Sequence, residues 1–137
     1  AYRDYPSVDN EPMSDGGIAD SIPVAEAYRR GARDMTVVLS RPLGYEKKPL
    51  AFPALTKRMF REQPGLAEAI IRRGERYNET LEFIRNPPED CRLRIIAPPE
   101  NFPVSRLTTD LNKLDLGYQQ GHRAAMAYLA ELAQEVA

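Results

Sequence analysis

The stretch Met-Thr-Val-Val-Leu at residues 35–39 decides the fold class. It is a short apolar run rich in β-branched residues, which is typical of a strand covered on both faces, as in a parallel sheet. A second run, Arg-Leu-Arg-Ile-Ile-Ala at residues 92–97, predicts another strand that ends at Pro98. Helical patterns lie between the two runs. The order strand, helix, strand predicts an α/β layered architecture, with a small and mostly parallel sheet flanked by helices.

Helical spacing of apolar residues predicts the elements in the middle of the chain. Residues 24–30 favour a short helix that ends at Gly31. A second helix is expected directly after Pro53, because proline suits the first helical position. A longer helix is expected over residues 66–84, with a bend at Gly74.

The two ends of the chain give further signals. Residues 5–14 favour extended segments around a turn at Asp9-Asn10-Glu11. From Asp110 onward the apolar positions step by three and four residues, which predicts a helical C-terminal extension with one apolar stripe. That stripe consists of Tyr118, His122, Ala125, Leu129, Leu132 and Val136.

The composition is that of one soluble globular domain or of a piece of a larger one. The 137 residues are 42% hydrophobic and 28% charged, and 19 basic and 20 acidic residues give a formal net charge of −1. This balance does not indicate binding to nucleic acid. The single Cys91 cannot form an internal disulfide, and no apolar run approaches the roughly 20 residues that span a bilayer. The first residues lack both an initiator methionine and the apolar core of a signal peptide, so we expect a cytoplasmic chain that is part of a longer protein.

Several catalytic and cofactor motifs are missing from the sequence. It has no Cys-x-x-Cys pair and one histidine, His122, so no metal site is expected. It also lacks the phosphate-binding loop, the dinucleotide fingerprint and the Gly-x-Ser-x-Gly nucleophile elbow, and no cofactor is expected. His122 and Cys91 are therefore interpreted as structural side chains.

The sequence Ser-Asp-Gly-Gly at residues 14–17 is the clearest candidate for chemistry. Asp15 is expected at a strand end, and two glycines after it remove side chains that would shield its carboxylate. The simpler interpretation is a tight turn in which Asp15 hydrogen-bonds its own backbone, and the residues alone favour it. Ser14 is not expected to act as a nucleophile, because adjacent side chains in a strand point to opposite faces.

An ordered set of segments carries a family resemblance. The segments are DGGIADSIPV at residues 15–24, AYRRGA at 27–32, VVL at 37–39, RPLGYEKKP at 41–49, RYNETL at 76–81 and IAP at 96–98. Together they resemble the bacterial patatin-like phospholipases. The later segments resemble the subgroup of that family with a C-terminal extension.

The resemblance implies a serine acyl hydrolase that cleaves lipid or other carboxylic esters with a Ser–Asp dyad and no histidine. Asp15 would be the dyad aspartate. From the residues themselves, Gly16 and Gly17 are expected to keep its loop open, and Asp20 is expected to cap the following helix or to support the Asp15 loop by hydrogen bonding. The family's serine elbow and oxyanion segment are absent. The resemblance therefore implies a C-terminal portion that is inactive alone, with residues 1–50 ending the catalytic domain and residues 51–137 forming the extension, including the strand at about 92–97.

The implied partners are the N-terminal remainder of the catalytic domain, an ester or lipid substrate, and a second copy of the chain at a severed sheet edge. Residues 29–61 hold nine basic and two acidic residues, which suggests peripheral contact with an anionic membrane. Pairing of opposite charges within the fold is the favoured explanation, because these basic residues are spread over several expected elements and need not share one face. The basic residues to test are Arg41, Lys47, Lys48, Lys57, Arg58 and Arg61. Two rival functions stay open: a non-catalytic α/β interaction domain and a module that binds anionic lipid surfaces.

Overall fold

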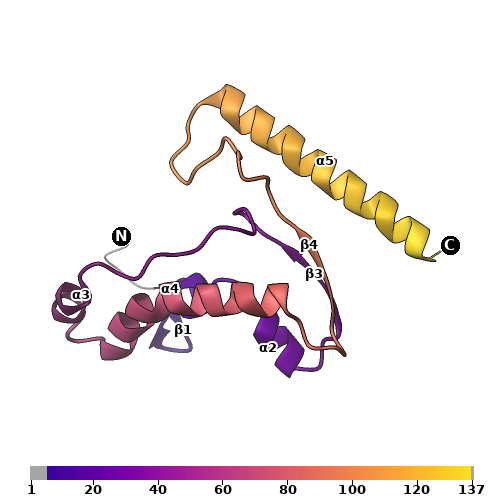
Figure 1. The fold of residues 1–137 in the computed structure, drawn as a ribbon. Helices are drawn as coiled ribbons and strands as arrows, with labels where there is room; N and C mark the ends of the chain where they lie inside the picture. Colours follow the sequence, from indigo (N-terminus) through magenta and orange to yellow (C-terminus); the bar gives the residue numbers. More distant parts are fainter. Residues whose placement is uncertain (1–5, 137) are drawn as a thin grey trace. The chain divides into compact units, whose positions relative to one another are not determined.

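The computed structural model describes residues 6–136 and has a mixed α/β fold (Figure 1). The chain divides into two compact units that alternate along the sequence. Within the described residues, unit 1 comprises residues 6–31 and 46–86, and unit 2 comprises residues 32–45 and 87–136. The expected division near residue 50 concerns which part belongs to a catalytic domain, and it stays a prediction.

Unit 1 begins with a small antiparallel hairpin of β1 (Ser7–Val8) and β2 (Glu11–Pro12). The turn between them places Asp9 and Asn10 at φ angles of 51° and 65°. Aspartate and asparagine tolerate this left-handed conformation better than most residues. The turn expected at these positions is therefore confirmed.

Four helices make up the rest of unit 1: α1 (Gly16–Ala19), α2 (Val24–Arg29), α3 (Pro53–Met59) and α4 (Pro64–Arg85). Gly31 follows α2 with a φ of 102°, which confirms the expected helix end. α4 runs continuously through Gly74, where the sequence predicts a bend. A Cβ atom at Gly74 would lie 3.0 Å from the carbonyl oxygen of Lys48, so this glycine permits close packing of a neighbouring segment.

The core of unit 1 lies along one face of α4. Ala67, Tyr77, Leu81 and Ile84 are buried there at helical spacing, and Leu81 and Ile84 are almost fully enclosed. Phe83 reaches α2, where its ring centroid lies 5.7 Å from that of Tyr28 in a tilted arrangement.

Unit 2 contains a parallel sheet of β3 (Asp34–Val38) and β4 (Arg92–Ile96). Both strands lie where the β-branched runs predict them. Alternation gives the sheet one apolar face, which includes Val37 and Ile95, and one face of mixed character. Val38 on the mixed face is 72% exposed, so the expectation that this strand is covered on both faces is wrong.

The long helix α5 (Leu111–Val136) belongs to unit 2 and confirms the expected C-terminal helix. Asp110 caps it, because its Oδ1 accepts hydrogen bonds from the backbone nitrogens of Asn112 (2.9 Å) and Lys113 (3.3 Å). Gly117 is buried, and a Cβ atom there would lie 2.5 Å from Val104. The helix therefore packs through its Gly117 face.

The expected apolar stripe of α5 is not the face that packs. Tyr118, His122 and Leu129 are exposed, and only Ala125 and Leu132 of the described stripe residues are half-buried. Helical periodicity identifies an apolar stripe but does not identify the face that meets the remainder of the fold.

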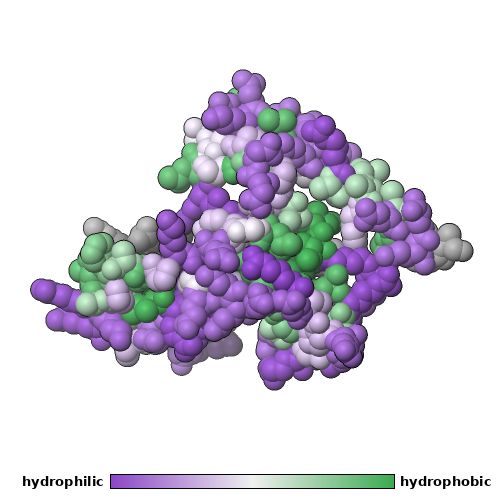
Figure 2. All heavy atoms as spheres, in the orientation of Figure 1, coloured by the Kyte–Doolittle hydropathy of each residue, from purple (hydrophilic) through white to green (hydrophobic). Residues whose placement is uncertain are grey.

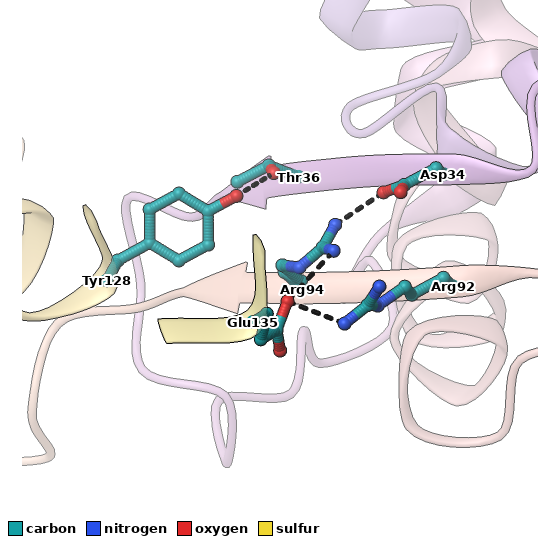
Figure 3. A network of polar contacts seen from close by, with 6 residues as sticks. All are labelled: Asp34, Thr36, Arg92, Arg94, Tyr128 and Glu135. Carbon is teal, nitrogen blue, oxygen red and sulfur yellow. Dashed lines mark hydrogen bonds and ion pairs between the residues drawn. The ribbon is translucent and has the colours of Figure 1, made fainter. Parts of the chain in front are cut away.

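A network of charged and polar side chains joins α5 to the mixed face of the sheet (Figure 3). Arg94 of β4 donates to Asp34 of β3 and to Glu135 of α5, the latter at 3.2 Å. Arg92 also contacts Glu135, at 2.5 Å. Nearer the middle of α5, the hydroxyls of Tyr128 and Thr36 lie 2.5 Å apart. The hydrogen bond to Asp34, followed by the weaker bond to Glu135, raises the pKa of Arg94 although desolvation opposes the shift.

Replacing Arg94 with methionine should loosen α5 from the sheet, because Asp34 and Glu135 then lose a shared cation. We expect a fall of several degrees in the melting temperature of the chain, measured by circular dichroism. Arg106→Met is the matched control, since Arg106 is exposed and makes no ion pair with a described residue. Equal melting temperatures for the two variants would show that the network does not hold the helix.

A second prediction concerns acid stability at α2. Two arginines bind Glu26 at 2.7 Å each, and the hydrogen bonds from Arg29 and then Arg30 lower the pKa of Glu26 from 4.5 to about 2. A carboxyl whose pKa is lower in the folded state stabilises the fold above its unfolded pKa, and this contribution disappears as pH falls from 4.5 to about 2. Glu26→Gln should therefore show a shallower loss of stability over that pH range in thermal melts. Glu79→Gln, on the exposed side of α4, should retain the wild-type slope.

Candidate functional site

Asp15 forms the N-terminal cap of α1. Its Oδ1 accepts a hydrogen bond from the backbone nitrogen of Gly17 at 2.9 Å, and its φ and ψ are −58° and 120°. The expectation that Asp15 hydrogen-bonds its own backbone is confirmed. The expectation of a strand end is wrong, because β2 stops at Pro12 and Asp15 begins a helix. Gly16 and Gly17 are helical and do not use the special conformations open to glycine.

The Asp15 carboxylate is exposed, and the two glycines leave space beside it. A Cβ atom on Gly16 would have no neighbour within 4 Å. A Cβ atom on Gly17 would lie 3.3 Å from Asp15 Oδ1 and 3.8 Å from Arg73 Nη2. The carboxylate and the guanidinium therefore border the same small space. No described residue donates a hydrogen bond to Asp15 Oδ2, so this oxygen can accept one from a further group.

Cationic side chains hold the Asp15 loop on α4. Arg73 Nε donates to the carbonyl oxygen of Gly17 at 2.9 Å, and Arg76 Nη1 donates to that of Ala19 at 3.0 Å. The hydroxyl of Ser21 also donates to the Gly17 oxygen, at 2.8 Å. These contacts satisfy carbonyl groups that a helix of four residues cannot satisfy by itself. Sequence reasoning missed both arginines, and their spacing of three residues in a helical pattern is the signal that could have found them.

Lys47 is the third cation at this loop. Its Nζ donates to Ser21 Oγ at 3.3 Å and lies 4.0 Å from the centroid of the Tyr77 ring. Asn78 bonds both the nitrogen and the carbonyl oxygen of Lys47, each at 2.9 Å. Because Lys47 is half-buried, its ammonium group interacts mainly with residues inside unit 1 and contributes less to an exposed basic surface.

Asp20 ends α1 and accepts a hydrogen bond from the backbone nitrogen of Ile22 at 3.1 Å. It therefore closes the turn before α2 and supports the Asp15 loop only through the backbone. Ser14 is exposed and precedes the cap.

The structure divides the candidate basic residues between the two units. Arg41 belongs to unit 2, where its guanidinium lies 5.1 Å from the Tyr45 ring centroid. It lines a cavity of about 210 Å³ together with Pro42, Tyr45, Glu100, Phe102 and Val104. The other five belong to unit 1, and four of these are exposed: Lys48, Lys57, Arg58 and Arg61.

The two side chains interpreted as structural, Cys91 and His122, differ in burial. Cys91 is a buried free thiol, as expected for a structural cysteine. His122 is exposed on α5, so the interpretation of it as a packed or partly buried structural histidine is wrong. Within residues 6–136, no group of three or more histidine, cysteine or acidic side chains is arranged to hold a metal ion. None of the described helices has the length and apolar character required to cross a bilayer.

Comparison with known proteins identifies relatives of the chain. A family model described as "Domain of unknown function (DUF6363)" matches residues 63–136, which span α4, β4 and α5 and exclude the Asp15 loop. The chain is also similar to the uncharacterized protein YjjU of Escherichia coli (strain K12), with 29% identity over 131 residues. That alignment covers 94% of this chain and 36% of YjjU, so the chain spans little more than a third of that relative. No solved structure matches the chain. Because the family model covers more than half of its residues, the chain belongs to the family of the domain of unknown function DUF6363.

Proposed function

We propose that the chain is the C-terminal part of a patatin-like serine acyl hydrolase that cleaves lipid or other carboxylic esters. In this proposal the α/β fold described above is one part of a patatin-like layered fold, and α5 belongs to a helical C-terminal extension. Asp15 is the dyad aspartate, whereas the serine and the oxyanion donors lie outside the chain. The chain alone is therefore inactive.

The proposal rests on the hydrogen bonding and the accessibility of the two oxygens of the Asp15 carboxylate. One oxygen, Oδ1, is held by the backbone nitrogen of Gly17, which fixes the direction of the group. The other oxygen has no partner among the described residues, and a Cβ atom at Gly16 would meet nothing within 4 Å. A fixed and accessible carboxylate oxygen is what a serine hydroxyl requires of a general base.

The proposed reaction uses that oxygen in two steps. The serine oxygen attacks the carbonyl carbon of an acyl ester while Asp15 accepts the hydroxyl proton, and the proton then passes to the departing alcohol. Asp15 next accepts a proton from water, whose oxygen attacks the acyl carbon. The bond between that carbon and the serine oxygen then breaks, Asp15 returns its proton to the serine oxygen, and the carboxylic acid leaves. The loop bonds from Arg73 and Arg76 keep the carboxylate in position through both steps.

The sheet of unit 2 supports the proposal of a missing catalytic partner. Among the described residues, β3 and β4 pair only with each other, so each strand leaves one edge unpaired. Parallel strands usually belong to larger sheets with helices on both faces. We therefore expect the N-terminal remainder of the catalytic domain to add strands to this sheet.

A non-catalytic interaction domain is the second candidate function. The hydrogen bond between Asp15 and Gly17 favours it, because capping α1 is a sufficient structural reason for an aspartate at this position. The hydrolase requires the negatively charged Asp15 carboxylate as a proton acceptor. The interaction domain requires only the hydrogen bond that caps α1.

Asp15→Asn in the full-length protein separates these functions, because asparagine also caps helices but is not a base. We expect hydrolysis of a short-chain p-nitrophenyl ester to fall by about 10²- to 10⁴-fold, with an unchanged melting temperature. Asp20→Asn is the matched control on the same loop and should retain activity. An active Asp15→Asn protein would exclude the dyad role and leave the interaction domain.

The two glycines give a second test of the site. Gly17→Ala places a methyl group 3.3 Å from Asp15 Oδ1, so the carboxylate must move by a few tenths of an ångström. Gly16→Ala places its methyl group in open space. Both positions are helical, so the backbone accepts alanine at each, and the melting temperature of each variant checks that the fold is retained. We expect Gly17→Ala to lower ester hydrolysis by the full-length protein, and Gly16→Ala to leave it near wild type. The reverse order of activities would contradict the assigned geometry.

A further inference from the structure

Large apolar side chains are exposed along α3 and the residues just before it. Phe52, Leu55 and Met59 are 71%, 55% and 70% exposed, and they are spaced by three and four residues. Leu50 is exposed as well. This spacing places the three side chains on one side of the short helix. Figure 2 shows the corresponding hydrophobic patch at the left of the molecule, over the position of α3 in Figure 1.

Basic residues accompany this apolar patch. Residues 47–61 contain five basic residues and no acidic one. Lys57 and Arg58 lie in the last turn of α3, and Arg61 follows it. Two acidic neighbours face this group: Glu68 lies 3.9 Å from Lys57, and Glu62 lies 3.8 Å from Arg61. Both ion pairs are loose and strongly exposed, so they neutralise the positive charge only weakly.

An exposed apolar stripe beside unbalanced positive charge is the pattern of elements that lie in the surface of an anionic membrane. Apolar side chains enter the boundary between head groups and acyl chains, while lysine and arginine remain at the phosphates. A purely apolar protein partner would not account for the absence of acidic residues between positions 47 and 61.

We propose that α3 and its flanking residues form a docking surface for an anionic phospholipid membrane. Phe52, Leu55 and Met59 enter the lipid surface, and Lys57, Arg58 and Arg61 attract it. The inference does not depend on the proposed hydrolase, since membrane binding requires neither the Asp15 carboxylate nor a serine.

The test measures sedimentation of the 137-residue chain with vesicles of phosphatidylcholine, with and without phosphatidylserine. We expect binding to the vesicles that contain phosphatidylserine, weaker binding as salt is added, and little binding to phosphatidylcholine alone. The chain alone carries the docking surface, so an inactive dyad in the full-length protein would leave this result unchanged.

Two variants locate the surface on α3. The triple change Lys57→Gln, Arg58→Gln and Arg61→Gln should lower the partition coefficient by about 100-fold. The matched control removes the same charge elsewhere through Arg106→Gln, Lys113→Gln and Arg123→Gln. The double change Phe52→Ser and Met59→Ser should weaken the binding that persists at high salt. Its control is Leu107→Ser with Leu111→Ser, at two exposed leucines of unit 2.

Three results would overturn the inference. The first is no binding of the wild-type chain to anionic vesicles. The second is an equal loss of binding in the α3 variants and their controls, which would indicate unspecific attraction. The third is concentration-dependent self-association that the Phe52 and Met59 changes abolish in the absence of vesicle binding, which would assign the patch to a second copy of the chain. Circular dichroism of each variant checks that the helices are retained.

Discussion

The carbonyl groups at the end of α1 impose the constraint on which the candidate site depends. A helix of four residues leaves most of its backbone groups without internal partners. Arg73 and Arg76, one turn apart on α4, reach the oxygens of Gly17 and Ala19 and supply those partners. The same helix buries Tyr77, Leu81 and Ile84. The core of unit 1 therefore fixes α4, and α4 fixes the loop that carries Asp15.

The cap geometry gives this constraint its chemical meaning. Because Gly17 occupies only one oxygen of Asp15, the cap orients the carboxylate without using its full capacity as an acceptor. The hydrogen bond to Gly17 is present whether Asp15 acts as a general base or only as a helix cap. The geometry therefore does not distinguish these two roles. The distinguishing property is the charge of the second oxygen, which asparagine removes while it retains the bond to Gly17.

The elements that follow from local patterns could be predicted from the sequence. The β-branched runs locate β3 and β4, Gly31 marks the end of α2, and Asp110 begins α5. The contacts that depend on which other elements a helix or strand packs against could not be predicted from the sequence. The apolar stripe of α5 includes Tyr118 and Leu129, yet the helix packs through Gly117, because close approach to Val104 decides the contact. In the sequence, Arg73 and Arg76 cannot be distinguished from solvated arginines of any helix. Only the fold, which brings the Asp15 loop to α4, shows that they bind its carbonyl oxygens.

The proposed membrane-docking surface and the proposed catalytic aspartate depend on the same structural support, the helix α4. α3 and α1 both pack on α4, so the proposed lipid surface and the proposed base rest on the same helix. α4 begins at Pro64, five residues after the last residue of α3, and reaches the Asp15 loop at Arg73, about two and a half turns later. A continuous helix transmits position over that length without a flexible joint. A membrane bound at α3 would therefore lie at a defined distance from Asp15, which is the arrangement that an enzyme acting on membrane lipids requires.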